Sequence, residues 1–271
     1  MYNTMKNRES WQLETESAKF YEEYFVPALF AQWAPRSVRM AEIKPGDHVL
    51  DVATGTGLVA RFAANQVGPK GSVTGYDLNP GMLKVAASIA PQIQWAQGPA
   101  EKLPFPADTF DAVTCQFGLM FFQDRAAAVR EMYRVLKPGR LLAIGVWDKL
   151  ENTPGYSAFV DLLATVGGEN AADVLRAPFD LGEKDDLFEV FRRAGVPKPD
   201  VQTQEGNAKF PSINTWVECD ILASPIKNLL SGDQYEALLK RAEKTLNPFT
   251  GARGAVEFKA PVHFAVLKKL G

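Results

Sequence analysis

The stretch VLDVATGTGLVARFA, from Val49 to Ala63, decides the fold because it combines an apolar run, a glycine turn and a second apolar run with helical spacing. The first run predicts a short buried strand, and the second predicts a helix that begins at the glycines. Its residues GTGLVA fit the Gly-x-Gly-x-x-Gly/Ala pattern of dinucleotide-binding corners. Asp51, however, ends the strand at the place where a pyrophosphate would lie.

Further strands and helices alternate outward from this corner. Apolar runs predict strands at residues 48–53, 72–78, 92–97, 110–118 and 140–147. Helices of about 12 residues are expected between them, one of which begins with Asn79 as N-cap and Pro80 at the first position. This alternation predicts a parallel, doubly wound α/β sheet with right-handed crossovers.

The remainder of the chain is less regular. We expect helical insertions at about residues 154–183 and 212–253, and strand-like runs at 200–210 and 255–269. Pro261 lies within the last run, which suggests an edge position or a bulge. The expected domains are an N-terminal helical cap, a nucleoside-binding core, and the rest of the core sheet with its insertions. Their bounds are 1–44, 45–150 and 151–271.

Composition excludes several classes of function. The 271 residues are 46% hydrophobic with a formal charge of −2 and no basic run, so we expect no nucleic-acid or membrane partner. No apolar run approaches the roughly 20 residues of a membrane span. The polar N-terminus is unlike a signal peptide, and the two cysteines form no framework, so we expect a cytoplasmic protein, a monomer or homodimer. We expect no metal site, because no cluster of His and Cys is present.

The carboxylate of Asp51 helps to choose the ligand. A helix that begins after a glycine turn favours an anion. Two unit charges about 4 Å apart interact by roughly 4 kcal/mol at an effective dielectric near 20. Asp51 would therefore repel a pyrophosphate, whereas it suits the ammonium and sulfonium of S-adenosylmethionine. Alternatively, Asp51 only holds the backbone amides of the loop, and both roles can hold together.

Asp77 supports a nucleoside ligand of either kind. It ends the second strand, 20 positions after Gly57, where an acid accepts hydrogen bonds from both ribose hydroxyls. This spacing does not distinguish S-adenosylmethionine from a dinucleotide.

Four motifs in order resemble a known family. VLDVATGTG, GYDLNPGML, AEKLPFPADTFDAV and RVLKPG are similar to successive motifs of the class I S-adenosylmethionine-dependent methyltransferases, in the ubiquinone/menaquinone-biosynthesis-like (methyltransferase type 11) group. The resemblance covers about residues 45–147. It implies a Rossmann-like, mainly parallel sheet of seven strands with the last one antiparallel, an N-terminal helical lid and helical insertions.

The resemblance also implies a role for each matching position. The loop from Ala53 to Gly57 would hold the methionine part of the cofactor, and Asp77 would bind the ribose. Leu78 and Met82 would line the adenine. The full set of expected cofactor residues is Asp51, Ala53, Thr54, Gly55, Gly57, Asp77, Leu78, Met82, Pro99, Ala100, Glu101, Gln116 and Phe117. Of these, Ala100 and Glu101 would flank the base edge, and Gln116 and Phe117 would border the methyl donor.

The sequence departs from that family at several points. Ala53 stands where many relatives have glycine, and Pro99 stands where many have an acidic residue, so adenine recognition would rely on Ala100 or a water. RVLKPG continues as RLLAIGVWD rather than as in the quinone enzymes, and their N-terminal signature is missing. The quinone substrates of that group are therefore not expected for this chain.

Two other functions remain open. Tyr133 and Lys137 match the Tyr-x-x-x-Lys pair of short-chain dehydrogenases, so an NAD(P)-dependent oxidoreductase is one alternative, although chance helical spacing explains the pair. A non-catalytic nucleoside-binding sensor is the other.

The acceptor side is expected to be aromatic. The predicted substrate pocket and lid residues are Tyr21, Tyr24, Phe25, Trp33 and Trp216, with Phe30 and Ile221 beside them. Ordinary core packing explains the same spacing, so both interpretations stay open. We expect S-adenosylmethionine to methylate a small, largely apolar or aromatic metabolite at O, N, C or S. No catalytic residue is assigned, because the donor is already activated and positioning is the main task of the protein.

Overall fold

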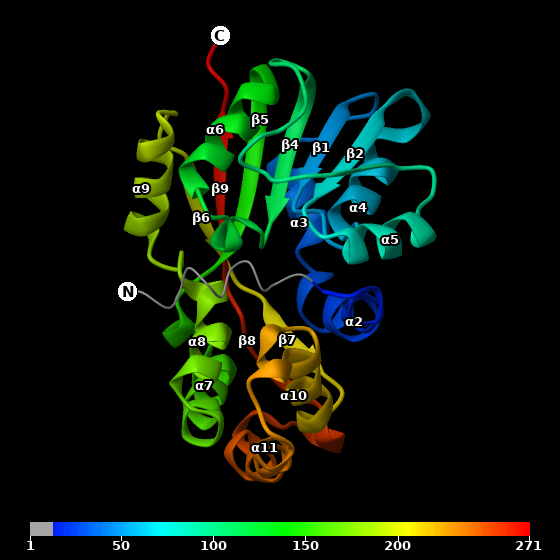
Figure 1. Cartoon of the computed structure of the whole chain (residues 1–271). Coiled ribbons are helices and arrows are strands. Elements are labelled where there is room, and N and C mark those ends of the chain that lie inside the picture. Colours follow the sequence, from blue (N-terminus) through cyan, green and yellow to red (C-terminus); the bar gives the residue numbers. More distant parts are fainter. Residues whose placement is uncertain (1–12) are drawn as a thin grey trace.

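A seven-stranded sheet forms one half of the molecule in the computed structural model, which describes residues 13–271 (Figure 1). The spatial order is β3-β2-β1-β4-β5-β9-β6. β9 runs antiparallel to both of its neighbours, and the pairings among β1 to β5 are parallel. The strands are β1 His48–Val52, β2 Ser72–Asp77, β3 Gln94–Gln97, β4 Phe110–Gln116, β5 Leu136–Trp147, β6 Asp200–Gln204 and β9 Val262–Lys268. The predicted Rossmann-like fold with an antiparallel last strand is confirmed.

The sheet is buried on both faces, as its nearly continuous apolar strands require. Successive side chains of a strand point to opposite faces, so Val49 and Leu50 of β1 belong to two different apolar clusters. Helices α3 (Ala34–Met40) and α4 (Leu58–Val67) cover the Val49 face. Helices α6 (Arg125–Val135) and α9 (Lys184–Ala194) pack together on the other side. Helix α5 (Pro80–Ile89) runs along β2 and β3, capped by Asn79 as expected.

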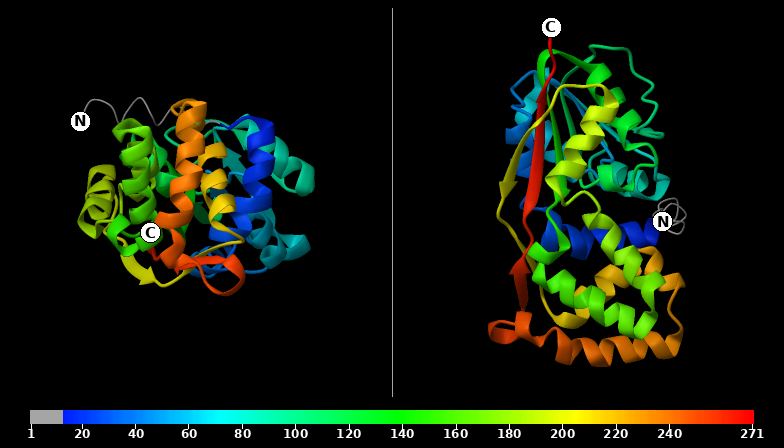
Figure 2. Two further views of the ribbon diagram at one scale, coloured as in Figure 1. Left: turned by 90° about the horizontal axis from the view of Figure 1, so that it is seen from below. Right: turned by 90° about the vertical axis from the view of Figure 1, so that its left-hand side faces the viewer.

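A helical half lies beyond the carboxyl ends of β1, β2 and β4 (Figures 1 and 2). It contains α7 (Pro154–Gly167), α8 (Glu169–Arg176), α10 (Ile213–Leu222) and α11 (Gly232–Thr245). A two-stranded sheet of β7 (Asn207–Phe210) and β8 (Val256–Lys259) joins them. Short 3₁₀ turns complete the chain at η2 Gly68–Lys70, η3 Leu119–Phe121, η4 Leu150–Asn152, η5 Ala177–Phe179, η6 Pro225–Asn228, η7 Asn247–Phe249 and η8 Ala252–Gly254.

The described N-terminal segment forms α2 (Thr15–Phe20) and the π-helix η1 (Tyr21–Phe30). It lies beside α10, as the view from below shows (Figure 2). Pro27 lies inside η1. Because proline has no N–H donor, the ladder widens there, and Ala31 N donates to Val26 O at 2.8 Å. Residues 1–12 of the expected cap lie outside the described residues.

Two expected strands are each divided between the two sheets. The run at 200–210 breaks at Gly206 into β6 and β7, and the run at 255–269 breaks at Pro261 into β8 and β9. The expectation of an edge position or a bulge at Pro261 is wrong, since β9 lies between β5 and β6. Proline suits the joint because the chain leaves one ladder there before it enters the next.

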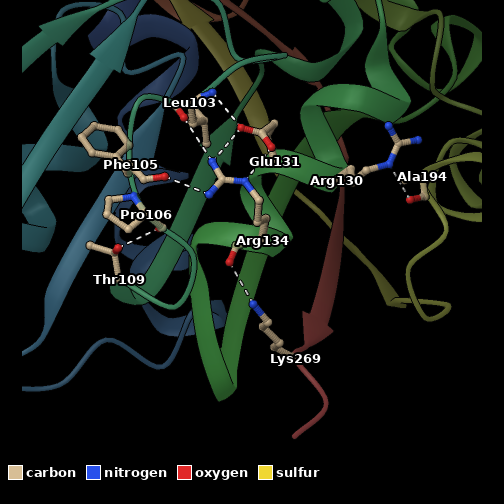
Figure 3. Close-up of polar contacts among 9 residues, drawn as sticks. All are labelled: Leu103, Phe105, Pro106, Thr109, Arg130, Glu131, Arg134, Ala194 and Lys269. Atoms are coloured by element: carbon tan, nitrogen blue, oxygen red, sulfur yellow. Dashed lines mark hydrogen bonds and ion pairs between the residues drawn. The ribbon is translucent and has the colours of Figure 1, made fainter.

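The connection from β3 to β4 is anchored by one arginine of α6 (Figure 3). Arg134 donates to the carbonyl oxygens of Leu103 and Phe105 at 3.1 and 2.9 Å. Glu131 accepts from Leu103 N at 2.9 Å and also binds the Arg134 guanidinium. This network fixes the loop that carries residues 99–101 to the end of the sheet.

Candidate functional site

A cavity of about 660 Å³ lies between the carboxyl ends of the parallel strands and the helical half. Such a position is where open α/β sheets bind ligands. The expected cofactor residues that line it are Asp51, Ala53, Thr54, Gly55, Asp77, Leu78, Met82, Pro99, Ala100, Glu101, Gln116 and Phe117. Their common location agrees with one binding site, and their individual roles stay predictions.

The glycine turn has an unusual backbone. Ala53, Gly55 and Gly57 all have positive φ, at 54°, 57° and 85°. This explains why glycine suits position 53, since alanine adopts that conformation at some cost. An added Cβ at Gly55 meets nothing within 4 Å, because Gly55 faces the cavity.

Gly57 differs from the rest of the expected set because it does not line the cavity. A Cβ at this position would collide with the ring of Trp95 and lie 3.3 Å from Ala86. Gly57 therefore lets α4 begin close to β3 and α5, which is a packing role, and its assignment as a cofactor contact stays a prediction.

Asp51 is 1% exposed and still borders the cavity. Its two carboxylate oxygens accept hydrogen bonds from the hydroxyls of Thr54 (2.6 Å) and Thr114 (2.7 Å). Burial raises the pKa of Asp51 to about 6, against the lowering effect of these hydrogen bonds. Asp51 thus holds the loop through the hydroxyl of Thr54, and the same carboxylate is a desolvated acid that a cation would stabilise.

Asp77 accepts hydrogen bonds from the backbone amides of Gly55 (2.7 Å) and Asn79 (2.8 Å). Burial raises its pKa, and these amides lower it. Because two carboxylate oxygens offer about four acceptor positions, both remain able to accept a further hydrogen bond. The arrangement links the glycine turn to the start of α5 and presents the acid to the cavity.

The part of the cavity expected to bind adenine has an exposed apolar side chain, Leu78, and an acid, Glu101, that is held by backbone amides. Leu78 is 50% exposed, which is unusual for a large apolar side chain. Glu101 accepts from the backbone amides of Gln123 (3.0 Å) and Asp124 (3.4 Å), so it holds the segment before α6.

The expected methyl-donor side is dominated by aromatic rings. Phe117 has φ 57° and stacks on Trp147, with ring centroids 4.0 Å apart and an interplanar angle of 10°. Phe30 approaches both rings, at 5.4 and 6.0 Å. Gln116 accepts from the Ser37 hydroxyl at 2.7 Å. Trp147 was missed from the sequence, although its place at the carboxyl end of a parallel strand was a usable signal.

The structure separates the expected pocket and lid aromatics into two groups. Tyr21 and Phe25 line the cavity, as does Phe30, and burial raises the pKa of Tyr21. Tyr24, Trp33 and Trp216 do not line it. Tyr24 is 37% exposed and pairs with Phe20.

The two tryptophans of that group are core residues. Trp33 is fully buried against Trp147 and Phe264. Trp216 is fully buried among the rings of Tyr156, Phe159, Phe210, Phe249 and Phe258. Ile221, expected beside Trp216, is likewise buried and outside the cavity wall. For these residues the core-packing interpretation is the correct one.

The helical half contributes polar wall residues that the sequence did not reveal. Tyr156 of α7, Asp220 of α10 and Ser224 line the cavity and are each at least 95% buried. Burial raises the pKa of Asp220 well above its ordinary value. The signal was an acid at an apolar position of INTWVECDIL, which periodicity alone does not connect to α7.

The oxidoreductase pair lies away from this site. Tyr133 Oη accepts from Leu270 N, and Lys137 forms an ion pair with Asp111, and neither residue lines the cavity. Among residues 13–271, no group of three or more metal-type side chains is found, and no helix is long and apolar enough to cross a membrane.

Comparison with known families decides among the interpretations. A model of the ubiE/COQ5 methyltransferase family matches residues 28–166, about half of the chain. The chain belongs to the ubiE/COQ5 methyltransferase family. The resemblance predicted from the four motifs is confirmed, and the oxidoreductase and sensor alternatives find no support.

Curated relatives of this ubiE/COQ5 family member match part of the chain. Ubiquinone/menaquinone biosynthesis C-methyltransferase UbiE of Ectopseudomonas mendocina is 44% identical over 126 residues, which are 44% of this chain and 49% of that protein. The chain thus spans about half the length of the curated relatives it matches.

Two solved structures show the same fold. The YcgJ protein of a Bacillus species is 23% identical with a TM-score of 0.59, covering 89% of this chain and 99% of that one. A Haemonchus contortus phosphoethanolamine N-methyltransferase, solved with phosphomonomethylethanolamine and S-adenosylhomocysteine, is 19% identical with a TM-score of 0.54, covering 89% and 53%.

Proposed function

We propose that this chain binds S-adenosylmethionine and transfers its methyl group to a small, largely apolar or aromatic acceptor at O, N, C or S. The observation that carries the proposal is the placement of Asp51 and Asp77 on the wall of one cavity, in a chain of a methyltransferase family. The oxidoreductase alternative lacks such a placement, because Tyr133 and Lys137 do not line the cavity.

The residues present fit this cofactor. The desolvated Asp51 carboxylate suits an ammonium or sulfonium, whereas no Lys, Arg or His among residues 13–271 lines the cavity to receive a pyrophosphate. Asp77 would accept from the ribose hydroxyls while it retains its two backbone amides. Leu78 and Met82 would cover the adenine, with Pro99 to Glu101 at its edge.

When bound, S-adenosylmethionine supplies an activated methyl group that needs only in-line attack. The chain would therefore act mainly by positioning and by excluding water. The stacked Phe117 and Trp147, with Phe30, would form the dry wall beside the methyl position. Tyr21 and Phe25 would close the cavity from the N-terminal segment.

The remaining expectations concern the domains, the location and the oligomeric state. The division at residues 44 and 150 is kept as a domain proposal, with the helical insertions forming the acceptor side. A cytoplasmic location and a monomeric or homodimeric state stay predictions.

The ribose contact tests the cofactor assignment. Asp77→Ala removes charge-assisted hydrogen bonds worth about 1.5–3 kcal/mol each, so S-adenosylhomocysteine should bind at least about tenfold more weakly by calorimetry. Asp161→Ala is the matched control, because Asp161 is exposed on α7 away from the cavity. Affinity in Asp77→Ala within about twofold of wild type would contradict the ribose role.

A further inference from the structure

Three buried polar side chains, Asp220, Tyr156 and Trp216, lie close to one another near the helical wall of the cavity. Burial raises the pKa of Asp220, whereas Tyr156 and Trp216 lower it as hydrogen-bonding neighbours. One atom of each side chain nevertheless makes no hydrogen bond of regular geometry to a described residue. These atoms are Asp220 Oδ2, Tyr156 Oη and Trp216 Nε1. Asp220 is 5% exposed and Tyr156 is 3% exposed, and both side chains belong to the cavity wall. Trp216 lies behind them in the core.

Such atoms are rare in folded proteins, since burying a polar group without a partner costs stability. Two of the three belong to side chains at a cavity large enough for a metabolite. A ligand that reaches this wall would supply the missing hydrogen bonds, which explains why the groups are there. The three groups also interact with one another in the core, and Asp220 and Tyr156 are the two that a ligand in the cavity can reach.

Asp220 lies on the opposite side of the cavity from the proposed cofactor loop. Its wall is built by α7, α8, α10 and η5, whereas the glycine turn belongs to β1 and α4. Leu175 and Phe179 flank the polar pair on this wall. This part of the cavity, which we call the acceptor subsite, thus offers two polar side chains among apolar ones.

The charge of the cavity restricts the ligand further. Asp51, Asp77, Glu101 and Asp220 line it, and no Lys, Arg or His side chain does so within the described part of the chain. The helix that begins after the glycine turn favours the carboxylate of the cofactor itself. A second anion, a carboxylate or phosphate on the acceptor, would meet the acids Asp51, Asp77 and Glu101 and the buried acid Asp220, with no cationic side chain of the described residues to pair with it. A donor of hydrogen bonds, neutral or cationic, would be attracted.

We propose that Asp220 and Tyr156 bind the polar head of the methyl acceptor, and that this head is a hydrogen-bond donor without negative charge, either a phenolic hydroxyl or an amine. This inference rests on the proposed function, because it concerns the acceptor end of the same cavity. Asp220 accepts the donor hydrogen, and the Tyr156 hydroxyl contacts the same head.

The test uses matched aromatic probes on the full chain saturated with S-adenosylhomocysteine. Calorimetry compares para-cresol and phenethylamine, which are donors, with para-methylanisole, which has no donor, and with phenylacetate, which is an anion. The variants are Asp220→Asn, Tyr156→Phe and the control Glu218→Gln. Glu218 is two residues from Asp220 on α10 but does not line the cavity.

We expect at least one donor probe to bind about tenfold more tightly than the anisole and the anion. Asp220→Asn should remove most of that preference and Tyr156→Phe part of it, while Glu218→Gln leaves it within about twofold. Whether cresol or phenethylamine is preferred identifies the phenol or the amine.

Three results would overturn the inference: neither donor binds, phenylacetate binds as tightly as the donors, or Asp220→Asn keeps the preference. Binding of S-adenosylhomocysteine, measured in the same samples, separates this failure from that of the proposed function. If it binds and the donors do not, only the acceptor subsite is wrong. If it does not bind, the cofactor proposal itself fails.

Discussion

Cofactor affinity should depend on pH through Asp51. This carboxyl is 1% exposed, and burial raises its pKa from 3.8 to about 6. A cationic group bound beside Asp51 favours the ionised form and lowers that pKa. Binding to a protein in which Asp51 is protonated must therefore release a proton, and affinity must fall as the pH falls below 6.

The size of the effect follows from the pKa. At pH 5 about one molecule in ten has Asp51 ionised, so the Kd for S-adenosylmethionine should be about tenfold larger than at pH 7 to 8, or about 1.4 kcal/mol. The stability of the ligand-free fold should change with pH in the opposite direction to the cofactor affinity. A folded pKa raised by about 2 units stabilises the fold by about 3 kcal/mol below the unfolded pKa, and this stabilisation is lost as the pH rises through 6.

Calorimetry at pH 5, 6, 7 and 8, in buffers of different ionisation enthalpy, measures both the affinity and the protons released. Asp51→Asn is the decisive variant because it keeps the shape and removes the titration. The pKa of Asp77 is also raised, so some slope will persist in the variant, and the difference between the two profiles belongs to Asp51. Identical profiles for wild type and Asp51→Asn, or an affinity that rises as the pH falls, would refute the reasoning.

Three other predictions concern the turn, the core and the N-terminal segment. Gly55→Val places a branched side chain at φ 57° on the cavity wall, so S-adenosylhomocysteine binding should be lost in calorimetry while circular dichroism shows a folded chain. Trp216→Ala should lower the free energy of unfolding by about 3–5 kcal/mol in a denaturant titration, and a loss below about 1 kcal/mol would contradict its core role. Amide exchange of residues 18–33 should slow when S-adenosylhomocysteine binds, since the segment is proposed as a lid, whereas equal strong protection in both states would identify a fixed helix.

Much of the sheet half was predictable because its signals are local. The turn between β1 and α4 needs glycines for positive φ, and the cap at Asn79 accepts from Gly81 N and Met82 N within its own helix. The carboxyl ends of parallel strands meet at one edge, so Asp51 and Asp77 could be placed together from their strands alone. Gly57 shows that the same glycine pattern can serve ligand approach and helix packing, which the sequence does not distinguish.

The aromatic residues of the N-terminal segment were harder to assign. Helical spacing predicts that side chains share a face, but it does not identify the neighbour that this face meets. Tyr21 and Phe25 meet the cavity, while Tyr24 turns outward and Trp33 enters the core beside Trp147. Pro27 made the assignment of these aromatic side chains harder, because η1 widens around it and changes the register of the following residues.

The cavity residues of the helical half could not be predicted from the sequence. Tyr156 and Asp220 belong to helices far apart in the chain, and they meet only because α7 and α10 pack around the rings of Trp216 and Phe258. No sequence motif predicts this pair, because the role of the two side chains depends on how they are buried in the folded chain. A cofactor that is the same throughout a family can be held by motifs near the glycine turn. The acceptor side of this chain depends on long-range packing instead, which places the buried acid Asp220 and Tyr156 on the same cavity wall. The proposal that the acceptor carries a hydrogen-bond donor therefore rests on the side chains of that wall and not on a sequence motif.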